Sequence, residues 1–111
     1  MIEKIIRDYL LSKLTVDVFV QLPKNPPDSY VVIERTGGRT ENHIRYATFA
    51  IQSIAPKMLA AIQLHEQVIE EMLNIIELDS IGSISLNSNY NFTDGDTGTY
   101  RYQAVFDIVY Y

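Results

Sequence analysis

The segment Ile44–Ile76, IRYATFAIQSIAPKMLAAIQLHEQVIEEMLNII, contains two hydrophobic periodicities in succession. In its first part, Ala47, Phe49 and Ile51 recur with a period close to two, which is typical of a strand. After this part the apolar residues recur at three- and four-residue spacing, which predicts a helix over Pro56–Ile76. The proline fits the first turn of this helix, because its missing N–H would have no helical partner there. A strand that runs into a long helix is therefore the centre of the predicted fold.

The predicted helix has one wide apolar face and one polar arc. At about 100° per residue the apolar residues fall on one side. They are Met58, Ala61, Ile62, Val68, Ile69, Met72, Leu73 and Ile76, with Leu64 and Ile75 on the flank. The polar arc consists of Gln63, Glu66, Gln67, Glu70, Glu71 and Asn74. A face this wide needs a sheet to cover it. Ile69 is expected to be buried between this face and the sheet, so replacing it with aspartate should unfold the protein by burying an unpaired charge.

The rest of the chain supplies a first helix and further strands. A short helix is predicted over Met1–Leu14 from its apolar stripe. Strands are expected at Val16–Leu22, Tyr30–Thr36, Ile44–Ile54, Ser83–Tyr90 and Tyr100–Tyr111. The hairpin between the second and third strands is expected to begin its turn at Gly37-Gly38, so that its tip is Gly37–His43, and Asn91–Thr99 is expected to be a turn-rich loop.

This order of elements, α-β-β-β-α-β-β, is typical of the α+β class. It predicts two helices packed on a mostly antiparallel sheet of four or five strands. With 111 residues, the chain has the length of one domain, residues 1–111, with a single two-layer core.

The composition excludes several classes of protein. The chain is 47% hydrophobic and 21% charged, which is ordinary for a globular protein. No apolar run is long enough to span a bilayer, and Glu3, Lys4, Arg7 and Asp8 interrupt what would be the apolar part of a signal peptide. We therefore expect no contact with a membrane and no secretion by a cleaved signal. The absence of cysteine excludes disulfides, thiolate catalysis and zinc–sulfur sites.

The charge argues against specific binding of nucleic acid. The formal net charge is −5, and a surface of that sign repels phosphates. A weakly repulsive wall would still allow DNA to pass close by, and it suits a conduit better than an adhesive surface does.

No group of residues forms a catalytic or metal-binding pattern. His65 falls on the apolar side of the long helix, where a core imidazole with one hydrogen bond is expected, and His43 is expected to be solvated at the hairpin tip. Asp94-Gly95-Asp96 resembles a fragment of a calcium loop, but the full pattern with a bidentate acid is missing, so an ordinary hairpin loop is expected. The glutamates of the polar arc are spaced as a solvated helix surface. We therefore expect neither catalysis nor a cofactor or metal.

The eight tyrosines are more informative. Tyr90, Tyr100, Tyr102, Tyr110 and Tyr111 gather in the last hairpin. A tyrosine offers a large rigid contact area with a polar tip, which is the chemistry of protein interfaces. The alternative is that most of them lie half-buried on the sheet. Both interpretations can hold, because one face of the sheet packs the helices while the other needs a cover.

The chain resembles the small tail-terminator (tail-completion) proteins of long-tailed phages and prophages. The resemblance covers nearly the whole chain and is one of pattern and length. It consists of a first helix, VFVQLP at residues 18–23, a proline-rich turn into YVVI at 30–33, and Gly37-Gly38 in a hairpin. These are followed by AIQS at 50–53, a helix, and the closing strand YRYQAVFDI at 100–108.

The resemblance implies a structural role in a virion. Such proteins form a ring, commonly a hexamer, on the last ring of the tail tube, where they stop tube polymerisation and present a surface to the head–tail connector. The implied partners are further copies of the chain, the tail tube protein and the connector, with DNA passing through the lumen without specific binding. The implied location is the virion tail, and the host cytoplasm during assembly.

Contacts between neighbours are expected at the two loops. Arg39, Glu41 and His43 lie at one tip, and Asp94 and Asp96 lie at the other. Opposite charges there would set the register between neighbours rather than supply much affinity.

Three alternatives remain open. A neck or head-closure protein has a similar size. A small ligand-binding regulatory module of the α+β class should have a closed apolar pocket with converging polar groups. A small enzyme should hold His65 or His43 beside a carboxylate in a cleft.

Overall fold

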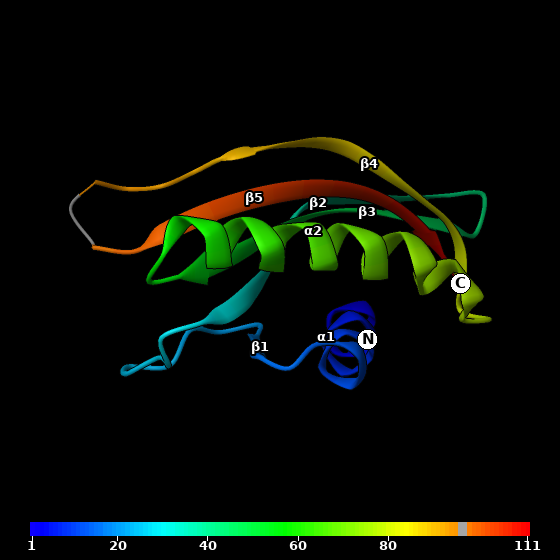
Figure 1. Ribbon diagram of the computed structural model, residues 1–111. Helices are drawn as coiled ribbons and strands as arrows, with labels where there is room; N and C mark the ends of the chain where they lie inside the picture. The colour runs from blue at the N-terminus through cyan, green and yellow to red at the C-terminus, as the bar shows by residue number, and fades with distance from the viewer. Residues whose placement is uncertain (96–97) are drawn as a thin grey trace.

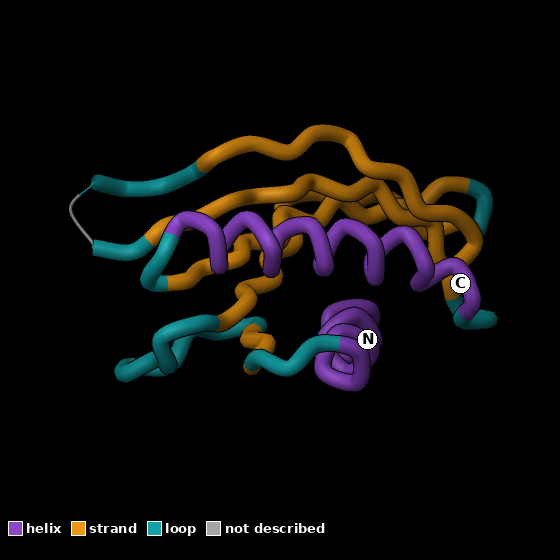
Figure 2. The backbone as a smooth tube through the Cα atoms, in the orientation of Figure 1, coloured by secondary structure: helices purple, strands orange, loops and turns teal. Residues whose placement is uncertain are grey.

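The computed structural model describes residues 1–95 and 98–111. It contains the helices α1 (Ile2–Lys13) and α2 (Met58–Asn74), a 3-10 turn η1 (Ile75–Glu77), and the strands β1 (Asp17–Phe19), β2 (Tyr30–Glu41), β3 (Ile44–Ala55), β4 (Ile81–Asn91) and β5 (Tyr100–Tyr110). The predicted α+β class and the order α-β-β-β-α-β-β are confirmed. Both helices lie on the same face of one curved sheet (Figure 1), and α2 runs along its length (Figure 2).

The sheet has five strands in the order β1-β2-β3-β5-β4. All neighbours are antiparallel except β1, which pairs in parallel with the start of β2. The predicted first strand, Val16–Leu22, was too long, because only Asp17–Phe19 pairs. A parallel neighbour forces the chain to leave the sheet and return to the start of β2, so Val20 and Leu22 lie outside it and are exposed.

The predicted turn at Gly37-Gly38 was wrong. Both glycines belong to β2, just after an irregularity between Arg35 and Gly37, and the turn is formed by Asn42 and His43. These two residues have φ values of 52° and 67°, as a two-residue hairpin turn of type I′ requires. Gly38 is needed for close approach of the strands, because a Cβ there would lie 2.9 Å from the backbone oxygen of Tyr46.

The buried face of α2 is rotated from the predicted one. Its buried residues are Ala61, Leu64, His65, Val68 and Met72, followed by Ile75 of η1. Met58, Leu73 and Ile76, which were predicted to be buried, are exposed, and Ile69 is only partly buried. The helix also begins at Met58 rather than at Pro56, because Lys57 before it has an extended backbone.

The rotation has a physical cause in α1, which packs beside α2 under the same face of the sheet. Ile2, Ile6, Tyr9 and Leu10 of α1 are buried in the same core as α2. Burial raises the pKa of Tyr9 to about 12, and the carboxylate of Glu77 beside it contributes to this shift. Because α1 contacts α2 from the side, the residues of α2 that are turned towards α1 are buried. The periodicity of α2 alone does not show on which side this second helix lies.

An ion pair holds α1 to the sheet. Arg35 Nη2 donates a hydrogen bond of 2.7 Å to Glu3 Oε1, and the guanidinium also lies 5.8 Å from the ring centroid of Phe49. Burial alone would raise the pKa of the Glu3 carboxyl. A hydrogen bond from its own backbone and the contact with Arg35 outweigh this and lower the pKa.

Val68→Asp should lower the free energy of unfolding by about 3–5 kcal/mol, because it buries an uncompensated charge at a position with no solvent exposure. Leu59→Asp is the matched control, since it makes the same change on the same helix at a residue that is 68% exposed. Urea unfolding followed by circular dichroism measures both. Equal stability of the two variants would contradict the observed orientation of α2.

Glu3→Gln should destabilise the protein by about 0.5–1 kcal/mol at pH 7, the upper range for a partly exposed ion pair. Because the folded-state pKa of Glu3 is lowered, its contribution is present above the unfolded-state pKa and disappears as the pH falls through the folded-state value. The difference between wild type and variant should therefore vanish at strongly acidic pH. A difference that is independent of pH would exclude the ion pair as its source.

Candidate assembly surface

One face of the sheet carries polar side chains in two rows that run across the strands. We call it the outer face, since among the described residues no helix covers it. In the first row, Gln52 Nε2 donates to Gln103 Oε1 at 3.0 Å, and Gln103 Nε2 donates to the hydroxyl oxygen of Tyr90. Gln103 is only 8% exposed despite the lack of a covering helix. The row therefore fixes its side chains in place instead of leaving them mobile in solvent.

The second row is centred on Asp107. Its Oδ1 accepts a hydrogen bond of 2.9 Å from Thr48 Oγ1, and its Oδ2 accepts one of 3.0 Å from Asn87 Nδ2. The carboxylate of β5 thus links β3 on one side to β4 on the other. Both rows make the outer face a preorganised polar surface, of the kind that can match a partner without rearranging.

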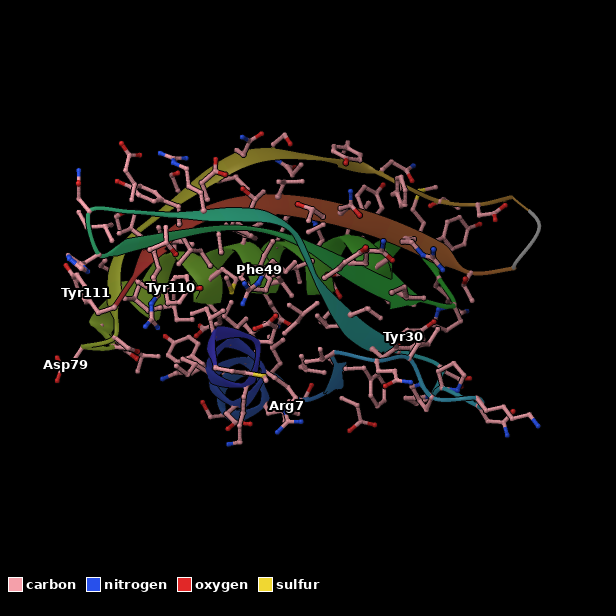
Figure 3. The ribbon with its side chains drawn as sticks, turned by 180° about the vertical axis from the view of Figure 1, so that it is seen from behind. Arg7, Tyr30, Phe49, Asp79, Tyr110 and Tyr111 are labelled. Carbon is pink, nitrogen blue, oxygen red and sulfur yellow. The ribbon has the colours of Figure 1, made fainter. Side chains whose placement is uncertain are left out.

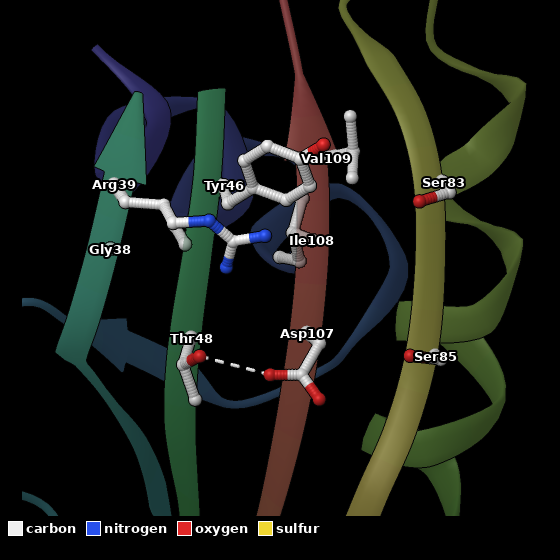
Figure 4. A pocket seen from close by; sticks show the side chains of 10 residues that line it. Gly38, Arg39, Tyr46, Thr48, Ser83, Ser85, Asp107, Ile108 and Val109 are labelled. Carbon is white, nitrogen blue, oxygen red and sulfur yellow. Dashed lines mark hydrogen bonds between the residues drawn. The ribbon is translucent and has the colours of Figure 1, made fainter. Parts of the chain in front are cut away.

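A trough of about 320 Å³ lies on the outer face beside the second row. Arg39 forms one side of it and extends across the ring of Tyr46, with the guanidinium carbon 4.0 Å from the ring centroid. Asp107, Ser83 and Ser85 line the other side (Figure 4). The trough therefore has a cation on one wall and an anion on the other. It is open to solvent along the sheet and differs from the closed apolar pocket expected of a ligand-binding module.

The structure separates Asp94 from the other described residues of the predicted contacts. Arg39 and Glu41 lie at the end of β2, where Arg39 Nε is 3.4 Å from Glu41 Oε2, and His43 is exposed in the adjoining turn. Asp94 lies in the loop that precedes β5, and Asp96 falls outside the described residues.

The register of β3 and β5 shows at which ends of the sheet the hairpin turn and Asp94 lie. Arg45 is paired with Tyr110 and Ala55 with Tyr100, so the hairpin turn and the Asp94 loop lie at opposite ends of a body 45 Å long. Figure 1 shows them at the two ends of the sheet. Within one chain, Asp94 does not meet Arg39, Glu41 or His43.

His65 has the environment expected of a core imidazole. It is 5% exposed, its Nε2 lies 3.2 Å from Asn89 Oδ1, and its ring centroid is 5.3 Å from that of Tyr102. The other ring nitrogen, Nδ1, is buried and has no hydrogen-bond partner among the described residues. The described residues also contain no group of three histidine or acidic side chains placed to hold a metal ion. In the same part of the chain, neither helix has the length and hydrophobicity needed to cross a membrane.

The polar rows were not predicted, although the sequence contains a partial signal. Gln103 and Asp107 alternate with apolar residues in β5 and so belong to its non-core face. Which residues of β3 and β4 lie opposite them depends on the strand order and on the irregularity between Leu86 and Ser88, and neither follows from periodicity.

Comparison with known proteins gives one informative result. No protein-family model matches the chain, and no curated protein matches it. Among solved structures, it is similar to a chain of the virion of a native gene transfer agent (GTA) particle, with a TM-score of 0.68 and 13% sequence identity. The similarity covers 94% of this chain and 92% of the other. At this level of identity the similarity concerns the fold.

Asp107→Ala should lower the free energy of unfolding by about 1–2 kcal/mol, because it removes both hydrogen bonds of the second row. Asp107→Asn is the matched control. The amide oxygen of the new asparagine can still accept the hydrogen bond from Thr48. Its NH2 group can donate to Asn87 if the amide of Asn87 rotates by about 180°. The loss of unfolding free energy should therefore be less than half of that in the alanine variant. Denaturant midpoints of the two variants test this, and an unaffected alanine variant would show that the row does not hold the strands.

Proposed function

We propose that the protein is a structural component of a phage-like particle that caps the tail tube as a ring, ends tube polymerisation and presents a surface for joining the head. The observation that carries the proposal is the similarity in fold, over nearly the full length of both chains, to a chain of a gene transfer agent virion. The resemblance of the sequence to tail terminators, which rests on different features, supports the same role. No catalytic role is proposed.

The edges of the sheet support assembly into a ring. Among the described residues, β4 pairs only with β5, so its other edge is free over Ile81–Asn91. At the opposite edge, β1 pairs with β2 only at Tyr30, Val31 and Val32, which leaves the rest of β2 free. Free strand edges are templates for pairing with another chain. Because the two edges differ, repeated contact between them is head-to-tail, which is the kind of contact that generates rings.

The charge of α2 fits a central channel for DNA. Glu66 and Glu70 are exposed on its solvent side, and the whole chain carries a net charge of −5. In the proposed ring this arc faces the lumen, where it keeps DNA from adhering.

The two ends of the body are suited to contacts between layers of the particle. Arg39, Glu41 and His43 at one end, and Asp94 at the other, are proposed to meet the connector and the tube or the next subunit. The same contact role is proposed for Asp96, which lies outside the described residues. Exposed charges of this kind set orientation and register rather than affinity. Which end meets which partner is decided by binding experiments with each partner alone.

The deciding experiment mixes the protein with polymerised tail tubes from the same phage. Electron microscopy should show density on one end of each tube, and capped tubes should not regrow when tube protein is added. Arg39→Glu should weaken completion of particles, because it reverses the charge at the hairpin end. Arg7→Glu makes the same substitution on α1, outside the proposed contact surfaces, and should be tolerated.

Two outcomes of this experiment would contradict the proposed role. Tubes that stay uncapped and regrow normally would refute the terminator role. Binding to the connector without binding to tubes would instead indicate a neck or head-closure protein.

A further inference from the structure

An apolar stripe runs along one flank of α2 and into η1, between the buried face of the helix and its solvent side. It consists of Met58, Ile62, Ile69, Leu73 and Ile76, which follow one another at the spacing of a helix face, and we call it the α2 ridge. Met58, Leu73 and Ile76 are 47%, 41% and 47% exposed. Ile62 and Ile69 between them are partly buried. A helix of a typical monomer has polar residues at exposed positions, so a row of exposed apolar side chains indicates an interaction site.

The α2 ridge lies on the side of the helix that faces β4. His65, which is neighbour to Ile62 and Ile69 on the helix surface, contacts Asn89 of β4. On the other side of α2, Glu71 and η1 lie near Tyr9 of α1. The ridge therefore runs beside β4, the strand whose outer edge is free at that end of the sheet.

The opposite end of the sheet carries a second apolar feature. After Phe19 the chain leaves the sheet and returns only at Tyr30, and we call residues 20–27 the β1 arm. Val20 and Leu22 on this arm are 43% and 48% exposed, and it contains three prolines that stiffen it. Seen from behind, the segment before Tyr30 extends beyond the sheet (Figure 3). A stiff exposed segment loses little conformational entropy when it binds.

The charges of the two features are complementary. Glu66 and Glu70 border the α2 ridge on its solvent side, and Lys24 lies on the β1 arm. None of the three forms an ion pair within the part of the chain that the structure describes. Contact between two ridges would bring four glutamates together, whereas contact between arm and ridge brings a lysine to a pair of glutamates.

We infer that the β1 arm of one copy lies along the α2 ridge of the next copy, beside the free edge of β4. Val20 and Leu22 cover the exposed residues of the ridge. Lys24 approaches Glu66 and Glu70 from the side of the ridge, so these glutamates lie at the edge of the contact, where the polar arc of α2 borders the lumen. The arm and the ridge are at opposite edges of the sheet, so the contact is head-to-tail and closes a ring by repetition. The inference rests on the proposed ring function and specifies the surfaces that form it.

Engineered cysteines test this contact without interference, because the chain has no cysteine of its own. Leu22→Cys and Leu73→Cys are prepared separately, mixed at high concentration with and without tail tubes, and oxidised mildly. We expect a disulfide between the two variants as the main product, identified by mass spectrometry. Leu11→Cys, on α1 and 43% exposed, replaces Leu22→Cys in the control mixture and should give several-fold less product.

Charge reversal provides an independent readout of the same contact. Lys24→Glu, added to the Leu22→Cys protein, should reduce the yield of the disulfide several-fold. Glu66→Lys with Glu70→Lys on the partner should restore it. A structural defect in either variant would not be repaired by the second change.

Two results would overturn the inference. One is a dominant disulfide between two Leu73→Cys chains, which would indicate contact between ridges. The other is a yield no higher than in the control mixture under both conditions. If the two cysteines cross-link specifically but the tubes stay uncapped, the contact between arm and ridge holds and the terminator role is refuted. If the tubes are capped but no specific cross-link forms, the terminator role holds and the contact is refuted.

Discussion

Val68 and Met72 of α2 are completely buried in the core that also contains Phe49 and Phe106, two residues paired across β3 and β5 in the middle of the sheet. This packing requires α2 to run along one face of the sheet, and α1 fills the remaining width on the same side. Both helices are thereby used on one face of the sheet. The outer face, the free edge of β4 and the α2 ridge are left to solvent or to a partner as a direct result.

The same constraint explains why the exposed surface is so uneven. The Gln103 and Asp107 rows of the outer face pair their polar groups with one another, so these rows are ordered without a cover. The side chains of the α2 ridge cannot be satisfied in this way, because they are apolar and form no hydrogen bonds. A partner is therefore favoured at the ridge, since covering its exposed apolar side chains removes apolar area from water.

Much of the fold follows from periodicity, and the errors have specific physical causes. Alternation in the strands and helical spacing in α1 and α2 were sufficient to predict the elements and their order. The extent of β1 was not predictable, because whether Val20 pairs depends on the direction of a neighbouring strand. The turn was misplaced because glycine serves two purposes, and Gly38 provides close contact between strands while Asn42 and His43 make the turn.

The candidate site was predictable only in part, for the same reason. The sequence identifies Arg39 and Asp94 as charged loop residues, but the 45 Å between the ends of the body follows from the pairing of β3 with β5. The exposed α2 ridge was predicted as core, because a helical wheel finds an apolar arc without knowing how much of that arc the neighbours cover. Leu73 and Val68 differ in burial through the position of α1, and no local pattern contains that information.

The strand order also has a consequence for the timing of synthesis. β5 is the last strand in the chain, yet it lies between β3 and β4, and it pairs with β3 along eleven residue pairs. While a ribosome is still translating the β4–β5 loop, β4 has no neighbour and the core lacks Phe106. The edge of β4 and the ridge beside it therefore acquire their geometry only when translation has passed β5. Up to that point a nascent chain does not present these surfaces to its neighbours.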